Sequence, residues 1–380
     1  MKIGYLSPTD PFQDKSNWSG TFYNLCQALT SAGHNVEWIP YQGKSVKQTI
    51  LRVLFRLRYL GKGYPIYWEK IGRQRVKSIK KDLSDYDLIF VTAQSEVLAW
   101  LKTDTPIVYY SDATIPLMVD YYWFNTSRTS IELAERTEKR ALDNATLKLY
   151  SSHWAAQSAI KFYKQDRRTV KVLPFGANLP SSVIQSNYNF KKGQTINILF
   201  SGVDWERKGG AIAVETVKKL VDDGYQAKLY ICGIRDLDRK TASYDFVIDK
   251  GFLDKNNSDD LKEYVSLWKK ADLFILPTRA ECSAIVFNEA AGFGVPVMTT
   301  DTGGLADYVI NGVNGYRMQL TDDSDKYALK IEQLIDDDEL PKLSLGALKL
   351  YEQSNSWKAW GESFNRVLES MIKNDKERIR

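Results

Sequence analysis

The chain has 380 residues, with 52 Lys and Arg against 47 Asp and Glu and a formal net charge of +5. Its 43% hydrophobic and 26% charged residues are ordinary for globular proteins and exclude collagen, coiled coil and extensive disorder. The length predicts about two domains, and no apolar run reaches the roughly 18 residues that would indicate a membrane-spanning helix.

Cysteine and histidine limit the chemistry further. The apolar stretch at the start of the chain is too short for a signal peptide and predicts a buried strand. Cys26, Cys232 and Cys282 have neither metal-ligand spacing nor a disulfide pattern, so we expect a cytoplasmic protein with reduced thiols. His34 and His153 lack the HExxH or GxSxG context of a zinc site or a serine triad, so we expect both to be structural or surface residues.

Short apolar segments alternate with predicted helices in the first half of the chain. A helix beginning near residue 21 places Phe22, Leu25, Cys26 and Leu29 on one face and ends at Gly33. The predicted strands are residues 2–6, 36–39, 87–93, 106–112, 146–152 and 169–176. This alternation predicts parallel βαβ units in a doubly wound α/β sheet.

A strongly basic segment, residues 44–81, separates the second and third of these strands. It holds twelve Lys or Arg and one acid, a net charge of +11. Helical periodicity predicts that Leu51 and Phe55 lie among cations on the face opposite the core. The predicted core face consists of Val46, Ile50, Val53, Leu54, Leu57 and Leu60.

Three interpretations of residues 44–81 remain open: a solvated face, a surface for an anionic membrane or acceptor, and a nucleic-acid site. Basic and aromatic residues together are typical of a segment at an anionic membrane surface. No nucleic-acid-binding motif accompanies them, so we do not expect a nucleic-acid partner.

The α/β pattern restarts in the second half of the chain. The predicted strands there are residues 196–202, 227–233, 272–278 and 295–300. We therefore expect a first domain of residues 1–178, a polar linker of residues 179–195, a second domain of residues 196–355, and a last helix over residues 356–380. Ligands of such sheets bind beyond the carboxyl ends of the strands, and the cleft between two domains is the default site.

An Arg-Lys pair follows the first strand of the second domain. Ser201 and Gly202 open the turn with small residues, and Arg207 and Lys208 stand just before a helix led by two glycines. Two cations beside helical N–H groups suit a diphosphate, although solvated charges at a helix start are the alternative.

Two glutamates follow the strand of residues 272–278. Glu281 lies in a loop of small residues, and Glu289, eight positions on, lies in the next helix. A carboxylate accepts paired hydrogen bonds from vicinal hydroxyls, so one glutamate could hold sugar hydroxyls and the other a ribose. Exposed carboxylates without a ligand are the alternative.

The two glutamates, the Arg-Lys pair and the run PVMTTDTGGLADYVINGVNGY resemble family 4 of the retaining glycosyltransferases, the glycosyl transferases group 1. SGTFYNLCQALTSAGHNV and LPFGANL extend the resemblance. It implies a GT-B fold, in which two Rossmann-like domains face each other across a cleft and the C-terminal helix crosses back to the first domain. It also implies a nucleotide-diphosphate sugar as donor, with a UDP-sugar expected, and a reaction that retains the anomeric configuration without a metal or cofactor.

The resemblance also implies roles for individual residues. Arg207 and Lys208 would hold the donor diphosphate, Glu281 the transferred sugar and Glu289 the ribose, while a backbone amide at Gly20 would reach the β-phosphate. The residues it implies for the donor site are Gly20, Ser201, Gly202, Ser283, Ala284, Ile285 and Glu289.

The sequence departs from the family pattern at three places. Ser19 stands where the first loop usually has Gly, and Ala284 stands where Gly is common. Many members have a histidine after the strand near residue 110, where this chain has Ser111 and Asp112. We expect Asp112 to hydrogen-bond a sugar hydroxyl or to position the acceptor, with a structural cap as the alternative.

The expected activity is transfer of a sugar to a hydroxyl of a glycan, glycolipid or lipid-linked oligosaccharide in polysaccharide biosynthesis, in the cytoplasm or at the inner face of the plasma membrane. An inverting GT-B transferase or an epimerase, with Asp112 as base, is one alternative. A non-catalytic nucleotide-sugar-binding subunit is another, but it would be expected to have lost Arg207, Lys208 or Glu281. A dehydrogenase is disfavoured because no GxGxxG follows the first strand.

Overall fold

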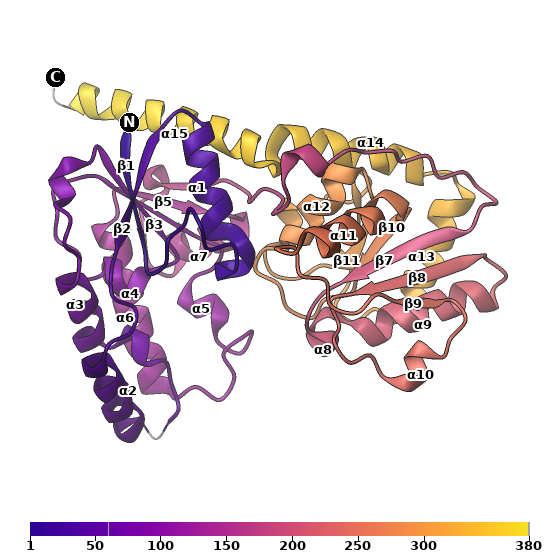
Figure 1. Cartoon of the computed structure of the whole chain (residues 1–380), viewed down its shortest axis with the longest axis horizontal. Helices are drawn as coiled ribbons and strands as arrows, with labels where there is room; N and C mark the ends of the chain where they lie inside the picture. Colours follow the sequence, from indigo (N-terminus) through magenta and orange to yellow (C-terminus); the bar gives the residue numbers. More distant parts are fainter. Residues whose placement is uncertain (60, 379–380) are drawn as a thin grey trace. The chain divides into compact units, whose positions relative to one another are not determined.

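The computed structural model of the protein describes residues 1–59 and 61–378. The chain forms two compact units: Met1–Pro174 together with the chain from Trp360 onward, and Phe175–Ala359. Each unit contains a six-stranded sheet whose paired strands all run parallel (Figure 1). The prediction of two Rossmann-like α/β domains is therefore confirmed.

The sheet of the first unit has the strand order β2-β1-β3-β4-β5-β6. All six strands predicted for this half of the chain are present. Their bounds are β1 (Lys2–Ser7), β2 (Asn35–Pro40), β3 (Leu88–Thr92), β4 (Ile107–Ser111), β5 (Leu147–Tyr150) and β6 (Val170–Val172). The last strand is shorter than predicted, and Pro174 just beyond it has no N–H to donate to a neighbouring strand.

The first unit's helices include most of the C-terminal helix, from Trp360 onward. They are α1 (Thr21–Ser31), α2 (Val46–Arg58), α3 (Glu69–Lys77), α4 (Ser95–Leu98), α5 (Ile115–Met118), α6 (Arg128–Asn144), α7 (His153–Lys161) and α15 (Trp357–Arg378). Aromatic side chains of α15 pack on this sheet. The Phe90 ring lies 5.7 Å from the Phe364 ring, and the Trp360 indole N–H donates to the Tyr110 hydroxyl at 3.1 Å.

The sheet of the second unit has the strand order β12-β11-β10-β7-β8-β9. Its strands are β7 (Ile196–Ser201), β8 (Ala227–Cys232), β9 (Val247–Asp249), β10 (Leu273–Leu276), β11 (Val297–Thr300) and β12 (Gly315–Met318). The two edge strands, β9 and β12, were not predicted, because they are short and only partly buried.

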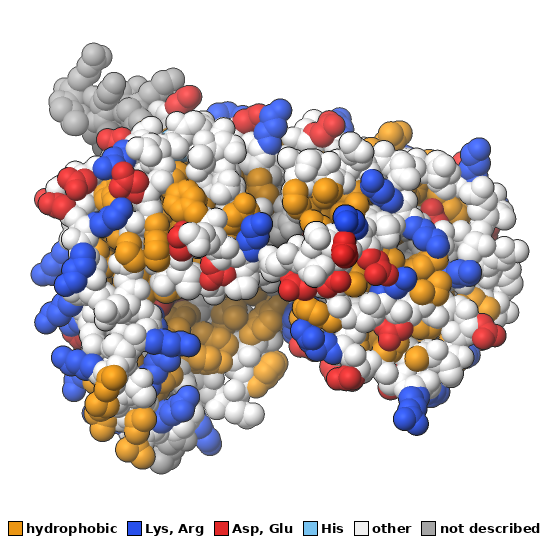
Figure 2. All heavy atoms as spheres, viewed as in Figure 1, with side chains coloured by type: hydrophobic (Ala, Val, Ile, Leu, Met, Phe, Trp, Pro, Cys, Tyr) orange, Lys and Arg blue, Asp and Glu red, His pale blue; other side chains and the backbone are white. Residues whose placement is uncertain are grey.

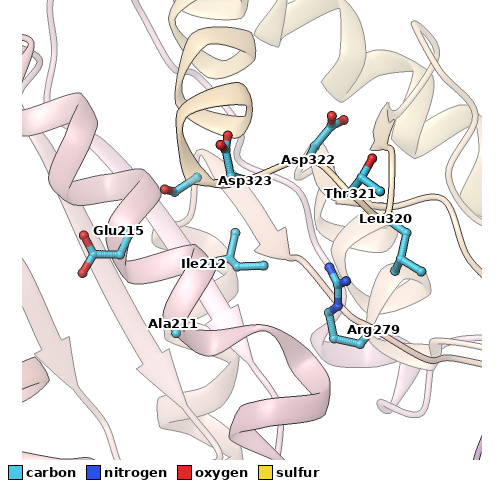
Figure 3. Close-up of a pocket in the computed structure, with 9 residues that line it drawn as sticks. Ala211, Ile212, Glu215, Arg279, Leu320, Thr321, Asp322 and Asp323 are labelled. Atoms are coloured by element: carbon cyan, nitrogen blue, oxygen red, sulfur yellow. The ribbon is translucent and has the colours of Figure 1, made fainter.

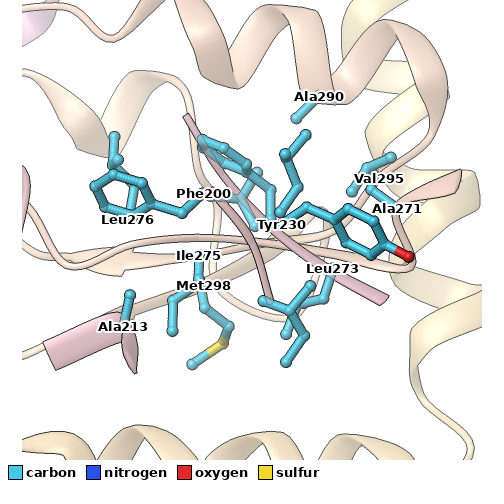
Figure 4. Close-up of a cluster of buried hydrophobic side chains, with 14 of the residues drawn as sticks. Phe200, Ala213, Tyr230, Ala271, Leu273, Ile275, Leu276, Ala290, Val295 and Met298 are labelled. Atoms are coloured by element: carbon cyan, nitrogen blue, oxygen red, sulfur yellow. The ribbon is translucent and has the colours of Figure 1, made fainter. Parts of the chain in front are cut away.

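Helices cover both faces of the second sheet (Figure 1). They are α8 (Trp205–Lys208), α9 (Gly210–Asp222), α10 (Arg239–Ala242), α11 (Ser258–Lys270), α12 (Ile285–Phe293), α13 (Ser324–Asp336) and α14 (Leu340–Leu350). Between sheet and helices lies a hydrophobic core of strand and helix side chains, including Phe200, Ile275 and Met298 (Figure 4). This core fixes the ends of β7 and β10, from which the loops of the candidate site extend.

The segment predicted as a linker, residues 179–195, lies within the second unit. Phe190 is buried in the core of that unit, and the Tyr188 hydroxyl donates to the Asp272 carbonyl at 2.9 Å. Its two aromatic side chains therefore tie this polar stretch to the second sheet.

The predicted orientation of α2 is wrong. Phe55, expected among exposed cations, is buried against the rings of Tyr59 and Trp68, and Leu51 is half-buried. The face predicted to be core is instead the exposed one, and it carries Val46, Ile50, Val53, Leu54 and Leu57. Leu60, assigned to the same face, lies outside the described residues.

The position of α2 follows from its aromatic and amide anchors. The Phe55 ring lies 4.3 Å from the Tyr59 ring, and the buried Gln48 side chain donates to the Gln42 carbonyl at 2.8 Å. Periodicity identified two faces, and these contacts decide which of them turns inward.

The three cysteines, Cys26, Cys232 and Cys282, are buried free thiols. His34 Nε2 lies 2.8 Å from the Asn365 Oδ1 atom, and burial lowers the pKa of this histidine. His153 is the first residue of α7.

Among the described residues, none of the helices combines the length and the apolar character needed to cross a membrane.

Candidate functional site

The strand order of the second sheet creates a switch point between β7 and β10. These strands are neighbours, and the chain leaves β7 toward β8 but leaves β10 toward β11, in the opposite direction along the sheet. Loops at such a point diverge and leave room for a ligand at the carboxyl ends of the strands. The predicted cations follow β7 and the predicted glutamates follow β10.

The turn after β7 holds the Arg-Lys pair in a fixed position. The Asp204 side chain caps α8 by accepting the Arg207 N–H at 3.1 Å, so the pair forms the last turn of this short helix. Gly209 follows with φ of 74°, and a Cβ at this position would lie 2.1 Å from the Pro277 carbonyl oxygen. Only glycine fits there, because both the backbone conformation and the closeness of the β10 loop exclude a side chain.

Three predicted residues meet in one ionic cluster. The Lys208 ammonium group and the Arg207 guanidinium both pair with the same carboxylate oxygen, Glu281 Oε2, the second at 3.3 Å. The side chains of Lys208 and Glu281 are only 12% and 11% exposed. Arg207 also donates to the Ala280 carbonyl at 3.1 Å and lies 3.3 Å from Asp204 Oδ2.

This cluster has the chemistry of an anion site whose cations are compensated by a carboxylate. The nearly buried Lys208 needs a counter-charge, and Glu281 supplies it. A diphosphate offers the same charge-assisted hydrogen bonds and would compete with Glu281 for Lys208. Just beyond Glu281, Ser283 and Ala284 lead into α12, whose first amides, including that of Ile285, belong to a helix N-terminus.

The second predicted glutamate belongs to a separate polar group. Glu289 lies in the second turn of α12 and is 1% exposed. Its Oε1 atom pairs with Lys255 Nζ at 2.8 Å, and its Oε2 atom accepts from the Tyr264 hydroxyl at 2.7 Å. Burial, followed by the negative charge of Glu289, raises the pKa of Tyr264 well above its usual value.

Small residues bring these two groups to the same strand end. The Tyr264 hydroxyl lies 3.4 Å from Ser201 Oγ, at the end of β7. A Cβ on Gly202 would lie 3.0 Å from Lys208 Cγ, and a Cβ on Gly233 would lie 2.5 Å from the Gly202 carbonyl oxygen. The Lys208 side chain therefore lies directly over the Ser201–Gly202 turn.

Three residues of this site were not predicted from the sequence. Asp204 precedes Arg207 by three positions, which is the spacing of a helix cap and could have been recognised. Lys255 and Tyr264 come from the loop before α11 and from α11 itself, 34 and 25 positions before Glu289. No local pattern connects them to Glu289, because the sheet alone brings α11 and α12 together.

The first unit presents its predicted residues at the carboxyl ends of its own strands. Gly20, after β1, is buried and has φ of 84° at the start of α1, following two further residues with positive φ, Trp18 and Ser19. The Asn24 side chain donates to the Gly20 carbonyl at 2.9 Å. Asp112 directly follows β4 and is half-buried.

A separate hollow of about 440 Å³ lies between the start of α9 and the loop before α13 (Figure 3). Its lining includes Ile212, Glu215, Arg279 and Asp322, none of them a predicted site residue. The Arg279 N–H donates to the Arg207 carbonyl at 2.7 Å, so the wall of the hollow also supports α8. Within the described residues, no three His, Cys, Asp or Glu side chains are grouped so that they could bind a metal ion.

Comparison with known families supports the resemblance seen in the sequence. Residues 184–343 match the family model described as glycosyl transferases group 1. The chain is 28% identical over 184 residues to the capsular polysaccharide biosynthesis glycosyltransferase CapM of Staphylococcus aureus, covering 45% of this chain and 47% of that protein. It is 26% identical over 254 residues to the D-inositol 3-phosphate glycosyltransferase of Corynebacterium jeikeium, covering 62% and 59%. The chain thus spans about half to three-fifths of the length of these relatives.

Solved structures share the fold over nearly the whole chain. The sucrose-phosphate synthase of Thermosynechococcus elongatus superposes with a TM-score of 0.68 at 16% identity, covering 98% of this chain and 99% of that one. Anabaena Alr3699/HepE in complex with UDP gives a TM-score of 0.64 at 18% identity, covering 97% and 100%. These likenesses confirm the GT-B architecture.

Proposed function

We propose that this chain, whose second unit carries the sequence pattern of the glycosyl transferases group 1, is a glycosyltransferase that uses a nucleotide-diphosphate sugar. The observation that carries the proposal is the cluster of Arg207, Lys208 and Glu281 at the switch point of the second sheet. It joins two cations from one loop with a carboxylate from another, at the place where an α/β sheet binds its ligand.

The donor would be a UDP-sugar. Its diphosphate would bind Arg207 and Lys208 and displace the Glu281 carboxylate, which would then accept hydrogen bonds from the transferred sugar. Glu289 would accept the ribose hydroxyls, held in place by Lys255 and Tyr264. Relatives named as glycosyltransferases, and a structural neighbour solved with UDP, support this choice of donor.

Charge separation explains how these residues would promote transfer. Breaking the glycosyl–diphosphate bond places positive charge on the sugar and negative charge on the leaving diphosphate. Arg207 and Lys208, both partly buried, would stabilise that negative charge without a metal ion. We propose same-face attack by the acceptor hydroxyl, with its proton passing to the leaving phosphate and the anomeric configuration retained.

The acceptor would be a hydroxyl of a glycan, glycolipid or lipid-linked oligosaccharide bound by the first unit. Gly20 would lend a backbone amide to the β-phosphate, and Asp112 would position the acceptor or contact a sugar hydroxyl. The name of the Staphylococcus aureus relative favours polysaccharide biosynthesis. The proposed place of action is the cytoplasmic face of a membrane.

A ligand panel tests the proposal directly. A nucleoside diphosphate at 100 times its dissociation constant should stabilise the protein by about 2.7 kcal/mol, which a thermal shift measures. We expect UDP to give the largest shift, and NMR of the product to show retention. If no nucleoside diphosphate shifts the melting temperature, the proposal fails. A product with inverted configuration would contradict the retaining mechanism and favour Asp112 as a general base.

A further inference from the structure

Helix α2 carries an exposed apolar stripe on the surface of the first unit. Its members Val46, Ile50, Val53, Leu54 and Leu57 are each between 48% and 80% exposed. On a helix of 100° per residue these five side chains fall within an arc of about 100°. Figure 2 shows the apolar side chains gathered over α2 at the lower left, beside Lys and Arg side chains.

Cations border this stripe on both sides. Lys47 and Arg58 fall at one edge of the arc and Arg56 beyond the other, and all three are exposed. The α2 sequence, VKQTILRVLFRLR, contains no Asp or Glu. The buried face opposite is anchored by Gln48 and Phe55, so the stripe is held outward.

The surrounding segment adds further positive charge. Three of the twelve cations of residues 44–81 are ion-paired, in Arg73–Glu69, Arg75–Glu96 and Lys81–Glu37. The exposed cations of the segment outside α2 and these pairs are Lys44, Lys62, Lys70, Lys77 and Lys80. The apolar stripe is therefore surrounded mainly by positively charged side chains of this segment.

From this arrangement we infer that α2 is an interfacial helix that lies along an anionic lipid bilayer. Its apolar stripe lies among the acyl chains, and the cations that border the stripe, Lys47, Arg56 and Arg58, lie at the headgroups. An apolar arc with basic edges is the pattern of helices that lie in the membrane interface. Anionic headgroups attract the surrounding cations, and the attraction weakens with salt.

Lipid suits this surface better than its two rivals. A second copy of the chain, docked stripe to stripe, would bring the like charges of both α2 helices together. A soluble polyanion would pair with the cations but would leave the five apolar side chains in water. That the docked surface serves a lipid-linked acceptor rests on the proposed function, whereas the docking itself does not.

Co-sedimentation with vesicles, without donor or acceptor, tests the docking separately from catalysis. We expect binding to vesicles of phosphatidylglycerol and phosphatidylcholine, none to phosphatidylcholine alone, and loss of binding as NaCl rises from about 0.05 M to about 0.5 M. Leu54→Ser/Leu57→Ser should lower the partition coefficient roughly tenfold or more. The matched control is Leu329→Ser/Leu345→Ser in the second unit. Those leucines are 49% and 70% exposed, and Leu54 and Leu57 are 48% and 70% exposed.

A site-specific label then tests insertion. The three native cysteines are buried, so a polarity-sensitive dye can be attached to Leu57→Cys and, as control, to Leu345→Cys. The dye at position 57 alone should shift to the blue with anionic vesicles. Three results would overturn the inference: no binding at low salt, equal binding of the Leu54→Ser/Leu57→Ser variant, or a concentration-dependent dimer that this variant abolishes.

Discussion

The Glu281 carboxylate forms an ion pair with the Lys208 ammonium group, so a predicted sugar contact neutralises a predicted diphosphate contact. Arg207 shares the same carboxylate oxygen at 3.3 Å. The donor would therefore have to exchange with Glu281 rather than enter a group of bare cations. Because of this exchange, substitutions at Glu281 and at the two cations should change UDP affinity in different ways.

Replacing Glu281 should divide binding from turnover. In Glu281→Gln the cations lose their internal counter-charge, so the affinity for UDP should stay the same or rise. Turnover should nevertheless fall at least tenfold, about 1.4 kcal/mol in the transition state, because the sugar loses a carboxylate partner. Calorimetric titration with UDP and a UDP-release assay measure the two effects. Weaker UDP binding in this variant would show that Glu281 does not compete with the diphosphate.

Removing either cation should weaken UDP binding as well as turnover. Lys208→Ala and Arg207→Ala should each weaken UDP binding and lower turnover at least tenfold, because each removes a charge-assisted contact to the leaving group. Lys218→Ala provides the control, since Lys218 pairs only at the surface with Asp222 at 3.0 Å. Near-normal turnover in both site variants would remove the diphosphate assignment.

The partners of Glu289 should govern nucleotide affinity. Lys255→Ala leaves a buried carboxylate without its charged partner and should cost about 1–3 kcal/mol of unfolding free energy. Both Lys255→Ala and Glu289→Gln should weaken UDP binding more than they lower turnover at saturating donor. Lys250→Ala, which breaks the more exposed pair with Glu263, should cost less than about 1 kcal/mol. UDP affinity that is unchanged in Glu289→Gln would disprove the ribose role.

Activity should not depend on a divalent cation. The leaving diphosphate would be stabilised by Arg207 and Lys208, so turnover after EDTA treatment and desalting should stay within about twofold of the untreated value. Adding back Mg²⁺ or Mn²⁺ provides the control. A strict requirement for either ion would refute the proposed charge stabilisation.

Stability of the first unit should depend on pH through Glu138. Burial raises the pKa of Glu138 to about 7, and the Ile115 N–H donates to its Oε2 atom at 2.6 Å. A carboxyl whose pKa is raised on folding favours the folded state when protonated. Its contribution is therefore complete below the unfolded pKa and is lost as the pH rises through about 7, a change of about 3 kcal/mol.

The comparison of Glu138→Gln with wild type isolates this effect. Urea unfolding at about pH 5 and about pH 8 should show the wild type losing stability relative to the variant at the higher pH. Glu132→Gln, at a half-exposed position of the same helix, should show the same change in unfolding free energy between the two pH values as wild type. If the unfolding free energies of Glu138→Gln and wild type changed equally with pH, Glu138 would not titrate in this range.

The sequence alone determined the architecture and pointed to the two candidate segments that follow β7 and β10. Apolar strands alternating with helices specify parallel βαβ units, and such sheets place their ligands at strand ends. Arg207 and Glu281 could be singled out as candidates because each follows a strong strand by only a few residues. These signals are local, so they survive without knowledge of the tertiary structure.

Only the tertiary structure decided which distant groups meet and which faces turn inward. The pairing of Lys208 with Glu281 depends on the adjacency of β7 and β10, and that of Lys255 with Glu289 depends on the packing of α11 beside α12. The orientation of α2 was predicted wrongly, because periodicity defines two faces but does not rank them. Aromatic contacts around Phe55 outweighed the larger aliphatic stripe and left that stripe exposed to solvent.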